Sequence, residues 1–262
     1  MEKKLVIIPT YNEIENIEKI IAAVSDIEGD YHILVIDDGS PDGTADAVRS
    51  IQKQCPDRIF LIERSGKLGL GDLNLTVAAS HENGRELGLG TAYVAGFKWA
   101  LEHDYDYIFE MDADFSHNPA DLPRLLAACV EGGADMSVGS RYCDGINVVN
   151  WPMGRIMISY CASIYVRTVL GFRIFDSTAG FVCYSRKVLE TIDLDAVRMK
   201  GYGFQIELKY TAHKLGFKIA EVPVVFVNRK EGTSKMSGSI FGEAFWGVLA
   251  LRFRKFKKAG KQ

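Results

Sequence analysis

The sequence predicts an α/β fold in which a mostly parallel central sheet carries helices on both faces. Short apolar runs alternate along the chain with segments whose apolar residues recur at helical spacing. The runs at residues 5–9 and 33–36 are continuously apolar, which is typical of strands buried on both faces. No linker rich in Pro, Gly or Ser interrupts residues 1–239, so we expect one domain over that range.

Strands and helices alternate regularly in the first half of the chain. The apolar strand at 5–9 precedes a helix whose apolar residues recur every three or four positions, namely Ile14, Ile17, Ile20, Ile21 and Val24. The apolar strands expected at 33–36 and 59–62 flank a helix that starts at Thr44. A helix at 91–101 then leads to the strand 107–111, and a helix from Pro119 to Val130 leads to the strand 136–139.

The second half is less regular. We expect an apolar helix at about 155–170, a strand near 180–184, a helix near 204–215 and short strands around 222–227. This part of the chain therefore adds elements to the predicted sheet without the strict alternation that characterises the first half.

Composition narrows the functional classes. Hydrophobic residues make up 47% of the 262 residues and charged residues 25%, which is ordinary for a globular protein and excludes a mainly disordered or coiled-coil chain. The net charge of -3 argues against a nucleic-acid partner. The five scattered cysteines lack metal-ligand spacing, so we expect reduced, mostly buried thiols in a cytoplasmic protein.

Polar motifs follow the predicted strands at the point where each strand ends. Residues 9–13 read PTYNE, 37–38 are Asp-Asp, 112–114 read DAD and 139–141 read GSR. Ligands bind at the carboxyl ends of the strands in open parallel sheets. Carboxylates that converge there would repel one another unless a divalent cation or a nucleoside ligand relieved the repulsion.

Asp112 and Asp114 are the sharpest chemical feature. Two carboxylates one residue apart can face Mg2+ or Mn2+ and leave room for phosphate oxygens. The structural alternative is a helix cap from Ser116 or Asn118, which is compatible with metal binding. The segment DDGSPDG at 37–43 likewise fits either a turn with a cap or a site in which Asp38 binds a base or ribose. The glycine-rich stretches lack the dinucleotide-binding pattern.

Together these motifs resemble the dolichyl-phosphate (polyprenyl-phosphate) mannose synthases of inverting glycosyltransferase family 2. The resemblance covers about 5–236 and includes PTYNE, VIDDGSPDGTADAV, GTAYVAGFKWAL, MDADFSHNP, VGSRY, NWPMGR, GYGFQIE and EGTSKM. It implies a nucleotide-diphospho-sugar transferase fold of the GT-A type, with a catalytic domain at 1–239. The implied reaction transfers mannose from GDP-mannose to a polyprenyl phosphate, with inversion at the anomeric carbon.

The resemblance also implies roles for individual residues. It assigns guanosine binding to Pro9, Tyr11, Glu13, Ile36 and Asp38. It places Asp112, Ala113 and Asp114 along the ribose and diphosphate, with Asp112, Asp114 and Ser116 as ligands of Mg2+ or Mn2+. It assigns phosphate binding to Arg141, Arg229 and Lys235, and the lipid phosphate to Arg155 and Ser159. Asp114, Arg229 and Lys235 are the expected catalytic residues.

The chemistry of the implied acceptor agrees with these roles. A phosphate monoester is already largely ionised near neutral pH, because its second pKa is about 6, so the transfer needs no general base. Alignment and charge neutralisation are the remaining requirements. Arg229 and Lys235 flank a Gly-Thr-Ser stretch, which suggests a loop that closes over phosphates, although solvated loop charge is the simpler alternative.

Two segments have the composition for contact with a membrane surface without spanning the membrane. The apolar helix at about 155–170 is flanked by arginines, and residues 240–262 combine aromatic residues with a basic end. We expect residues 240–262 to form a basic amphipathic helix at a lipid surface, with a core-packed terminal helix as the alternative. The resemblance also allows small membrane protein partners and places the protein on the cytoplasmic face of a membrane.

One segment departs from the family pattern. LGLG occurs at 68–71 and again at 87–90, which suggests an inserted segment at about 68–90 with duplicated ends. The insertion is either a tolerated surface loop or an obstacle near the ligand. Two other functions therefore stay open: a family 2 enzyme with another nucleotide sugar or acceptor, such as UDP-glucose, and a nucleotide-sugar binder impaired by the insertion.

Overall fold

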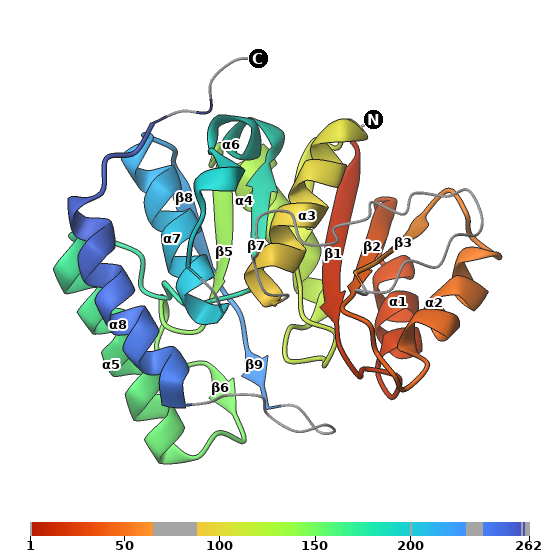
Figure 1. Ribbon diagram of the computed structural model, residues 1–262, viewed down its shortest axis with the longest axis horizontal. Coiled ribbons are helices and arrows are strands. Elements are labelled where there is room, and N and C mark those ends of the chain that lie inside the picture. The colour runs from red at the N-terminus through yellow and green to blue at the C-terminus, as the bar shows by residue number, and fades with distance from the viewer. Residues whose placement is uncertain (1, 65–87, 200, 229–237, 258, 260–262) are drawn as a thin grey trace.

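The computed structural model describes residues 2–64, 88–199, 201–228, 238–257 and 259 (Figure 1). Its main sheet has the strand order β3-β2-β1-β4-β7-β5-β8. The strands are β1 (Lys4–Thr10), β2 (Tyr31–Asp37), β3 (Ile59–Glu63), β4 (Tyr107–Glu110), β5 (Met136–Ser140), β7 (Val182–Ser185) and β8 (Ile219–Pro223). Only β7 runs antiparallel to its neighbours in this sheet, so the prediction of a mostly parallel sheet is confirmed.

Helices cover both faces of the sheet, as predicted. Leu5 and Ile7 of β1 join the core under α3 (Leu89–Glu102), α6 (Arg186–Thr191) and α7 (Gly201–Lys214). Val6 and Ile8 point to the opposite face, under α1 (Ile17–Ser25), α2 (Thr44–Gln52) and α4 (Leu122–Val130). The alternation follows from the two-residue period of a strand, and both sets are fully buried.

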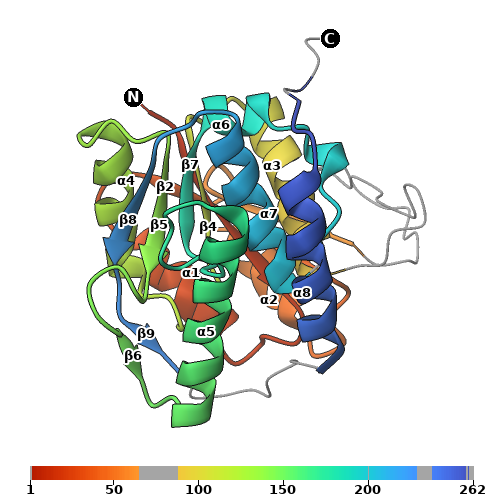
Figure 2. The ribbon, with the colours of Figure 1, turned by 90° about the vertical axis from the view of Figure 1, so that its left-hand side faces the viewer.

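Two further helices form an outer layer beside α7. Helices α5 (Met153–Leu170) and α8 (Gly238–Phe253) lie next to each other and run in the same direction, as Figure 2 shows. The Tyr165 ring of α5 stacks on the Phe245 ring in the middle of α8, with 4.8 Å between the ring centroids. At the ends of the two helices, the Arg252 Nη1 of α8 donates to the Leu170 carbonyl of α5 at 3.2 Å. We call α5 and α8 the outer helix pair. Among the described residues, none of the helices has both the length and the apolar character needed to span a membrane.

The structure refines several predicted boundaries. The helix expected from Pro119 begins as a 3-10 turn, Pro119–Asp121, and the Asn118 side chain caps this turn by accepting a hydrogen bond from the Ala120 amide. The short strands expected around 222–227 are β8, which begins at Ile219, and β9 (Phe226–Val227), which pairs with β6 (Val148–Val149) in a separate sheet. The terminal helix spans Gly238–Phe253 and packs on α7, so it includes two residues assigned to the catalytic domain.

The cysteine prediction was wrong in one respect. All five thiols are free, but only Cys129 and Cys183 are buried, whereas Cys55 and Cys161 are exposed and Cys143 is half-buried. The inserted segment was expected at about 68–90, and most of it lies outside the described residues, because residues 65–87 are not among them. Its last part, Gly88–Gly90, leads into and begins α3.

Candidate active site

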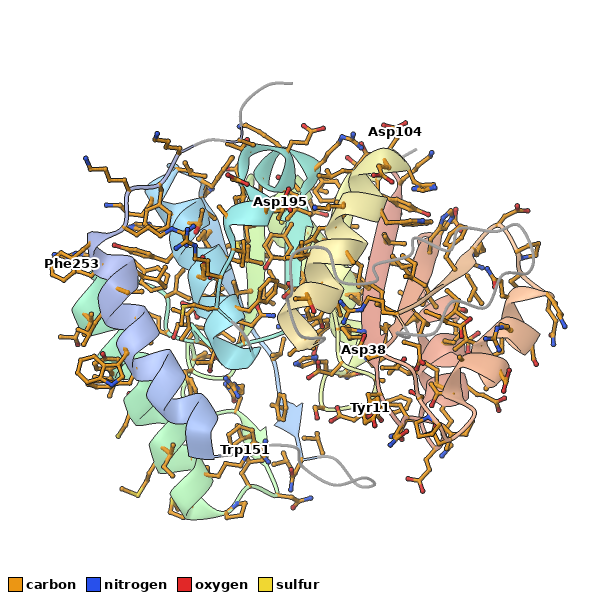
Figure 3. The ribbon with its side chains drawn as sticks, in the orientation of Figure 1. Tyr11, Asp38, Asp104, Trp151, Asp195 and Phe253 are labelled. Carbon is orange, nitrogen blue, oxygen red and sulfur yellow. The ribbon has the colours of Figure 1, made fainter. Side chains whose placement is uncertain are left out.

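A cavity of about 1230 Å3 opens at the carboxyl edge of the sheet. In Figure 3, Tyr11 and Asp38 lie at this edge across from Trp151, whereas Asp104 and Asp195 lie at the opposite end of the molecule. The cavity continues from the strand ends to the outer helix pair. Its walls therefore join the polar motifs of the first half of the chain to the apolar helices of the second.

Most of the predicted site residues lie together in this cavity. Its lining includes Pro9, Tyr11, Glu13, Asp38, Asp112, Ala113, Asp114, Ser116, Arg141, Arg155 and Ser159. Ile36 is the exception, because it shares a face of β2 with Leu34 and its buried side chain belongs to the core beneath α3. The Ile36 side chain therefore does not line the cavity, and the guanosine contact expected of this residue stays a prediction. Arg229 and Lys235 lie outside the described residues.

The loops after β1 and β2 are held together by the first aspartate of the Asp-Asp pair. The buried Asp37 carboxylate accepts hydrogen bonds from the Thr10 hydroxyl at 2.9 Å and from the Ser40 amide at 2.8 Å. Ser40 in turn accepts from the Asn12 amide at 2.9 Å. The turn that was one of the two alternatives for residues 37–43 is therefore present, and it holds the loop that carries Tyr11 and Glu13 in place.

Asp38, the second aspartate, faces the cavity and pairs with a residue that sequence reasoning missed. The Arg64 guanidinium donates to both carboxylate oxygens of Asp38 at 2.7 Å, and it also donates to the Thr91 hydroxyl at 3.0 Å. Arg64 is itself buried. This arrangement holds the Asp38 carboxylate at the cavity wall, from which it can accept a hydrogen bond from a base or ribose.

Asp112, Asp114 and Ser116 occupy a tight loop after β4. Phe115 has a φ of +58°, which places a non-glycine residue in the left-handed region and turns the chain sharply between the aspartate and the serine. The Asp114 Oδ1 accepts from the Ser116 amide at 3.0 Å, and the Asp112 amide donates to the His117 Nδ1 at 3.1 Å. Burial lowers the pKa of His117 to about 4, so its imidazole stays neutral and accepts this hydrogen bond.

The oxygen atoms of this loop fit Mg2+ or Mn2+. Within the described ranges, no three His, Cys, Asp or Glu side chains group closely enough to hold a metal ion by themselves. Mg2+ commonly takes one or two protein carboxylates and completes its coordination with substrate phosphates and water. Two carboxylates and a hydroxyl lining one cavity therefore suit a cation that is shared with a diphosphate.

A buried ion pair holds Arg141 beside this loop. The Asp176 carboxylate accepts from the Arg141 Nε and Nη2 at 2.6 Å each and from the Arg141 backbone amide at 2.9 Å. Burial alone would raise the pKa of Asp176, but the charge and hydrogen bonds of Arg141 hold it below its ordinary value. The guanidinium, which is expected to bind phosphate, is thus fixed at the cavity wall.

Arg155 and Ser159 lie one helical turn apart on the cavity side of α5. The Arg155 guanidinium stacks over the Trp151 ring at 3.9 Å and donates to the Asn228 side chain at 2.9 Å. The Ser159 hydroxyl accepts from the Tyr142 hydroxyl at 2.7 Å. A cation and a hydroxyl are thus presented together, as an acceptor phosphate would require.

The far end of the cavity is apolar. It is lined by Ile158, Ala162, Tyr165 and Val166 of α5, Phe245 and Val248 of α8, and Ile206 of α7. This end lies between the outer helix pair and α7, where the side chains offer a hydrocarbon surface.

A buried polar group next to the Asp112 loop also escaped sequence reasoning. The Gln205 side chain lies between Glu110 and Lys209, with its Nε2 2.7 Å from the Glu110 Oε2 and its Oε1 3.0 Å from the Lys209 Nζ. Burial raises the pKa of Glu110 to about 8 and lowers that of Lys209 to about 8. The only sequence signal for this group was a glutamine and a lysine four residues apart on the helix expected near 204–215.

Comparisons with known proteins agree with this architecture. The model of Glycosyl transferase family 2 matches residues 5–193. A polyprenol monophosphomannose synthase from Mycolicibacterium smegmatis is 46% identical over 252 residues, covering 94% of this chain and 88% of that protein. An undecaprenyl-phosphate mannosyltransferase from Micrococcus luteus is 43% identical over 251 residues, covering 94% of each. The resemblance stated from the motifs is therefore confirmed.

Solved structures show the same fold at lower sequence identity. The complex of Mycobacterium tuberculosis glucosyl-3-phosphoglycerate synthase with Mn2+, uridine-diphosphate and phosphoglyceric acid superposes with a TM-score of 0.67 at 20% identity. That comparison covers 96% of this chain and 79% of the other, and it confirms the predicted GT-A type fold. With a matching family model and close relatives along nearly its whole length, this chain belongs to glycosyltransferase family 2 and is an enzyme of that family.

Proposed function

We propose that the chain transfers mannose from GDP-mannose to a polyprenyl phosphate, with inversion at the anomeric carbon and with Mg2+ or Mn2+ as cofactor. The observation that carries this proposal is that one continuous cavity joins the Asp112–Asp114 loop to the apolar end between the outer helix pair and α7. The names of the two relatives supply the acceptor and the sugar. A nucleotide sugar would occupy the polar end and a lipid phosphate the apolar end, with their reacting groups meeting between them.

At the donor end, protein groups match the parts of a sugar nucleotide. Tyr11, Glu13 and Asp38 line the part of the cavity beside β1 and β2 and would contact the guanosine. Asp112, Asp114 and Ser116 would hold Mg2+ or Mn2+, which supplies positive charge to neutralise the departing diphosphate. Arg141 would add a fixed cation on the same wall, and Arg229 and Lys235 complete the phosphate-binding set that the sequence predicts.

At the acceptor end, Arg155 and Ser159 would hold the lipid phosphate. A phosphate monoester is mostly ionised at neutral pH, so one of its oxygens can attack the anomeric carbon without a general base. Displacement of GDP from the opposite face gives inversion. The protein then contributes alignment and fixed charges, and Trp151 contributes by stacking against the Arg155 guanidinium.

Exposed apolar residues on the outer helix pair provide a route to a bilayer. Trp246 is 70% exposed, Phe253 85%, Met153 70% and Met157 60%, while Arg252, Lys255 and Lys257 lie exposed near the end of α8. Val248 and Leu251 pack inward, and Arg254 pairs with the buried Glu207, so one face of α8 is core-packed and the other is free to contact lipid. We therefore propose peripheral attachment to the cytoplasmic face of a membrane.

Transfer of labelled mannose tests the reaction. The purified chain is incubated with labelled GDP-mannose, a polyprenyl phosphate and Mg2+, and organic-extractable label is counted, with labelled UDP-glucose as the parallel donor. The proposal predicts extractable mannose and far less extractable glucose. Extractable glucose in excess of mannose would overturn the donor assignment. Sedimentation of the chain with anionic vesicles, and much less with neutral ones, is expected from the basic end of α8.

A further inference from the structure

Gln205 presents a fixed hydrogen-bond donor to the cavity. Its side chain is 1% exposed and lines the cavity. The Lys209 ammonium can only donate hydrogen bonds, so the amide oxygen must face Lys209 and the NH2 group must face Glu110. A flipped amide would set an NH2 group against an ammonium. The second N–H of Gln205 has no acceptor among the described residues.

Tyr93 lines the same cavity and contributes a second polar group, its hydroxyl. Its side chain is fully buried, and its Oη has no hydrogen-bond partner within the described part of the chain. The Tyr93 ring stacks on Phe204, the neighbour of Gln205 in α7, at 6.0 Å between centroids. Burial and then the Asp112 and Glu110 charges raise the pKa of Tyr93 well above its ordinary value, so the hydroxyl stays protonated.

Gly180 lines the same cavity. A Cβ atom at Gly180 would lie 3.8 Å from the Gln205 Nε2 and 3.8 Å from the His117 Cε1. Gly180 therefore lies close to both the Gln205 amide and the imidazole that accepts from the Asp112 amide. Buried polar groups without partners are costly in a folded protein, so a ligand that supplies the missing partners gains both affinity and specificity.

We propose that Gln205 and Tyr93 bind the hydroxyl groups of the transferred sugar and thereby select it. Sugar hydroxyls both donate and accept, so they can accept from the Gln205 N–H and exchange a hydrogen bond with the Tyr93 hydroxyl. The pair lies beside the Asp112–Asp114 loop, where the hexosyl group attached to a bound diphosphate would be found. This inference rests on the proposed donor, and it makes Lys209 and Glu110 positioning residues for Gln205.

Paired titrations of GDP-mannose and GDP test the inference. GDP lacks the sugar. Substitution of a residue that contacts only the sugar should therefore raise the dissociation constant of GDP-mannose and leave that of GDP unchanged. Tyr93→Phe removes only the hydroxyl, and we expect it to weaken GDP-mannose binding by about three- to tenfold with GDP binding unchanged. Gln205→Met, which keeps the shape of the side chain, should show the same selective loss.

Tyr105→Phe is the matched control. Tyr105 is also buried, and its hydroxyl lies 2.8 Å from the His32 Nδ1, but it does not line the cavity, so its variant should bind both ligands as the wild type does. Equal losses for GDP and GDP-mannose in Tyr93→Phe, or no loss for either, would overturn this inference alone. Failure of the wild type to bind GDP-mannose would overturn the proposed donor and the inference with it.

Discussion

The ion pair between Arg141 and Asp176 allows a quantitative prediction. Asp176 is fully buried, and its two oxygens accept three hydrogen bonds from Arg141, at 2.6, 2.6 and 2.9 Å. Asp176→Asn keeps the size of the side chain, removes its charge and replaces one acceptor by a donor that faces the guanidinium. The buried Arg141 guanidinium then loses the negative charge that Asp176 supplies.

The expected cost follows from that geometry. Removing one partner of a buried pair typically costs about 3–5 kcal/mol. Because the asparagine oxygen can still accept from the guanidinium, we expect a cost of about 3 kcal/mol for this variant. Asp195→Asn is the matched control, because Asp195 is 77% exposed and pairs with Lys98 at 2.7 Å on the surface. Surface pairs contribute about 0.2–1 kcal/mol, so the control should lose no more than that.

Urea unfolding at neutral pH measures both values, with circular dichroism as the signal. The pH dependence provides a second test of the same pair. The pKa of Asp176 is lowered in the folded state, so its stabilising effect is present above the unfolded value of about 3.9 and is lost as the pH falls through the folded value. Equal free energies of unfolding for the Asp176→Asn and Asp195→Asn variants would refute the reasoning.

Two other predictions concern the folded core. Gly96→Ala would place a Cβ 2.8 Å from the Ile36 Cδ1 and 2.9 Å from the Ile7 Cδ1, so we expect a loss of about 1–3 kcal/mol in urea unfolding. Gly154→Ala, where nothing lies within 4 Å, is its control, and equal effects would contradict the packing argument. Burial raises the pKa of Glu110 from 4.5 to about 8, so the folded state retains a proton that the unfolded state releases. The free energy of unfolding should therefore fall more steeply between about pH 5 and 8 in the wild type than in Glu110→Gln, and identical slopes would count against the raised pKa.

The sheet was predictable because each buried parallel strand leaves a continuous apolar run in the sequence. The runs at 5–9 and 33–36 lie within β1 and β2, and residues 5–8 and 33–36 are buried. The direction of β7 was not predictable, because the apolar run near 180–184 carries no information about which neighbours pair with it. Its antiparallel pairing depends on β4 and β5, which are distant in sequence.

The candidate site was predictable where strand ends carry polar residues, and it was missed where partners meet only in the folded chain. Asp38 and Asp112 follow β2 and β4, and both line the cavity. Arg64 and Asp38 are 26 residues apart in the sequence, and Gln205 and Glu110 are 95 residues apart. No local sequence pattern therefore predicts either contact. The Ile36 side chain lies in the core because of its position in the two-residue strand period, so the guanosine contact expected of Ile36 stays a prediction.

The outer helix pair shows why one pattern supported two interpretations. The aromatic residues of α8 occur around the helix, so they could signal either packing or lipid contact. Val248 and Leu251 pack on the core, whereas Trp246 and Phe253 are exposed. The direction in which the helix packs decides between the two interpretations residue by residue, and that direction is a tertiary property.

The central claim is that a cation held at the Asp112–Asp114 loop supports mannose transfer to a lipid phosphate. The most direct measurement is the initial rate of labelled mannose transfer from GDP-mannose to a polyprenyl phosphate, for the wild type, Asp114→Asn and Asp121→Asn, with Mg2+ and with a chelator. Asp121 lies in the same segment but pairs with Arg124 at the start of α4. We predict that the chelator abolishes transfer, that Asp114→Asn lowers it at least about 100-fold, and that Asp121→Asn retains it. Transfer that persists with the chelator, or an Asp114→Asn rate equal to the wild-type rate, would contradict the account.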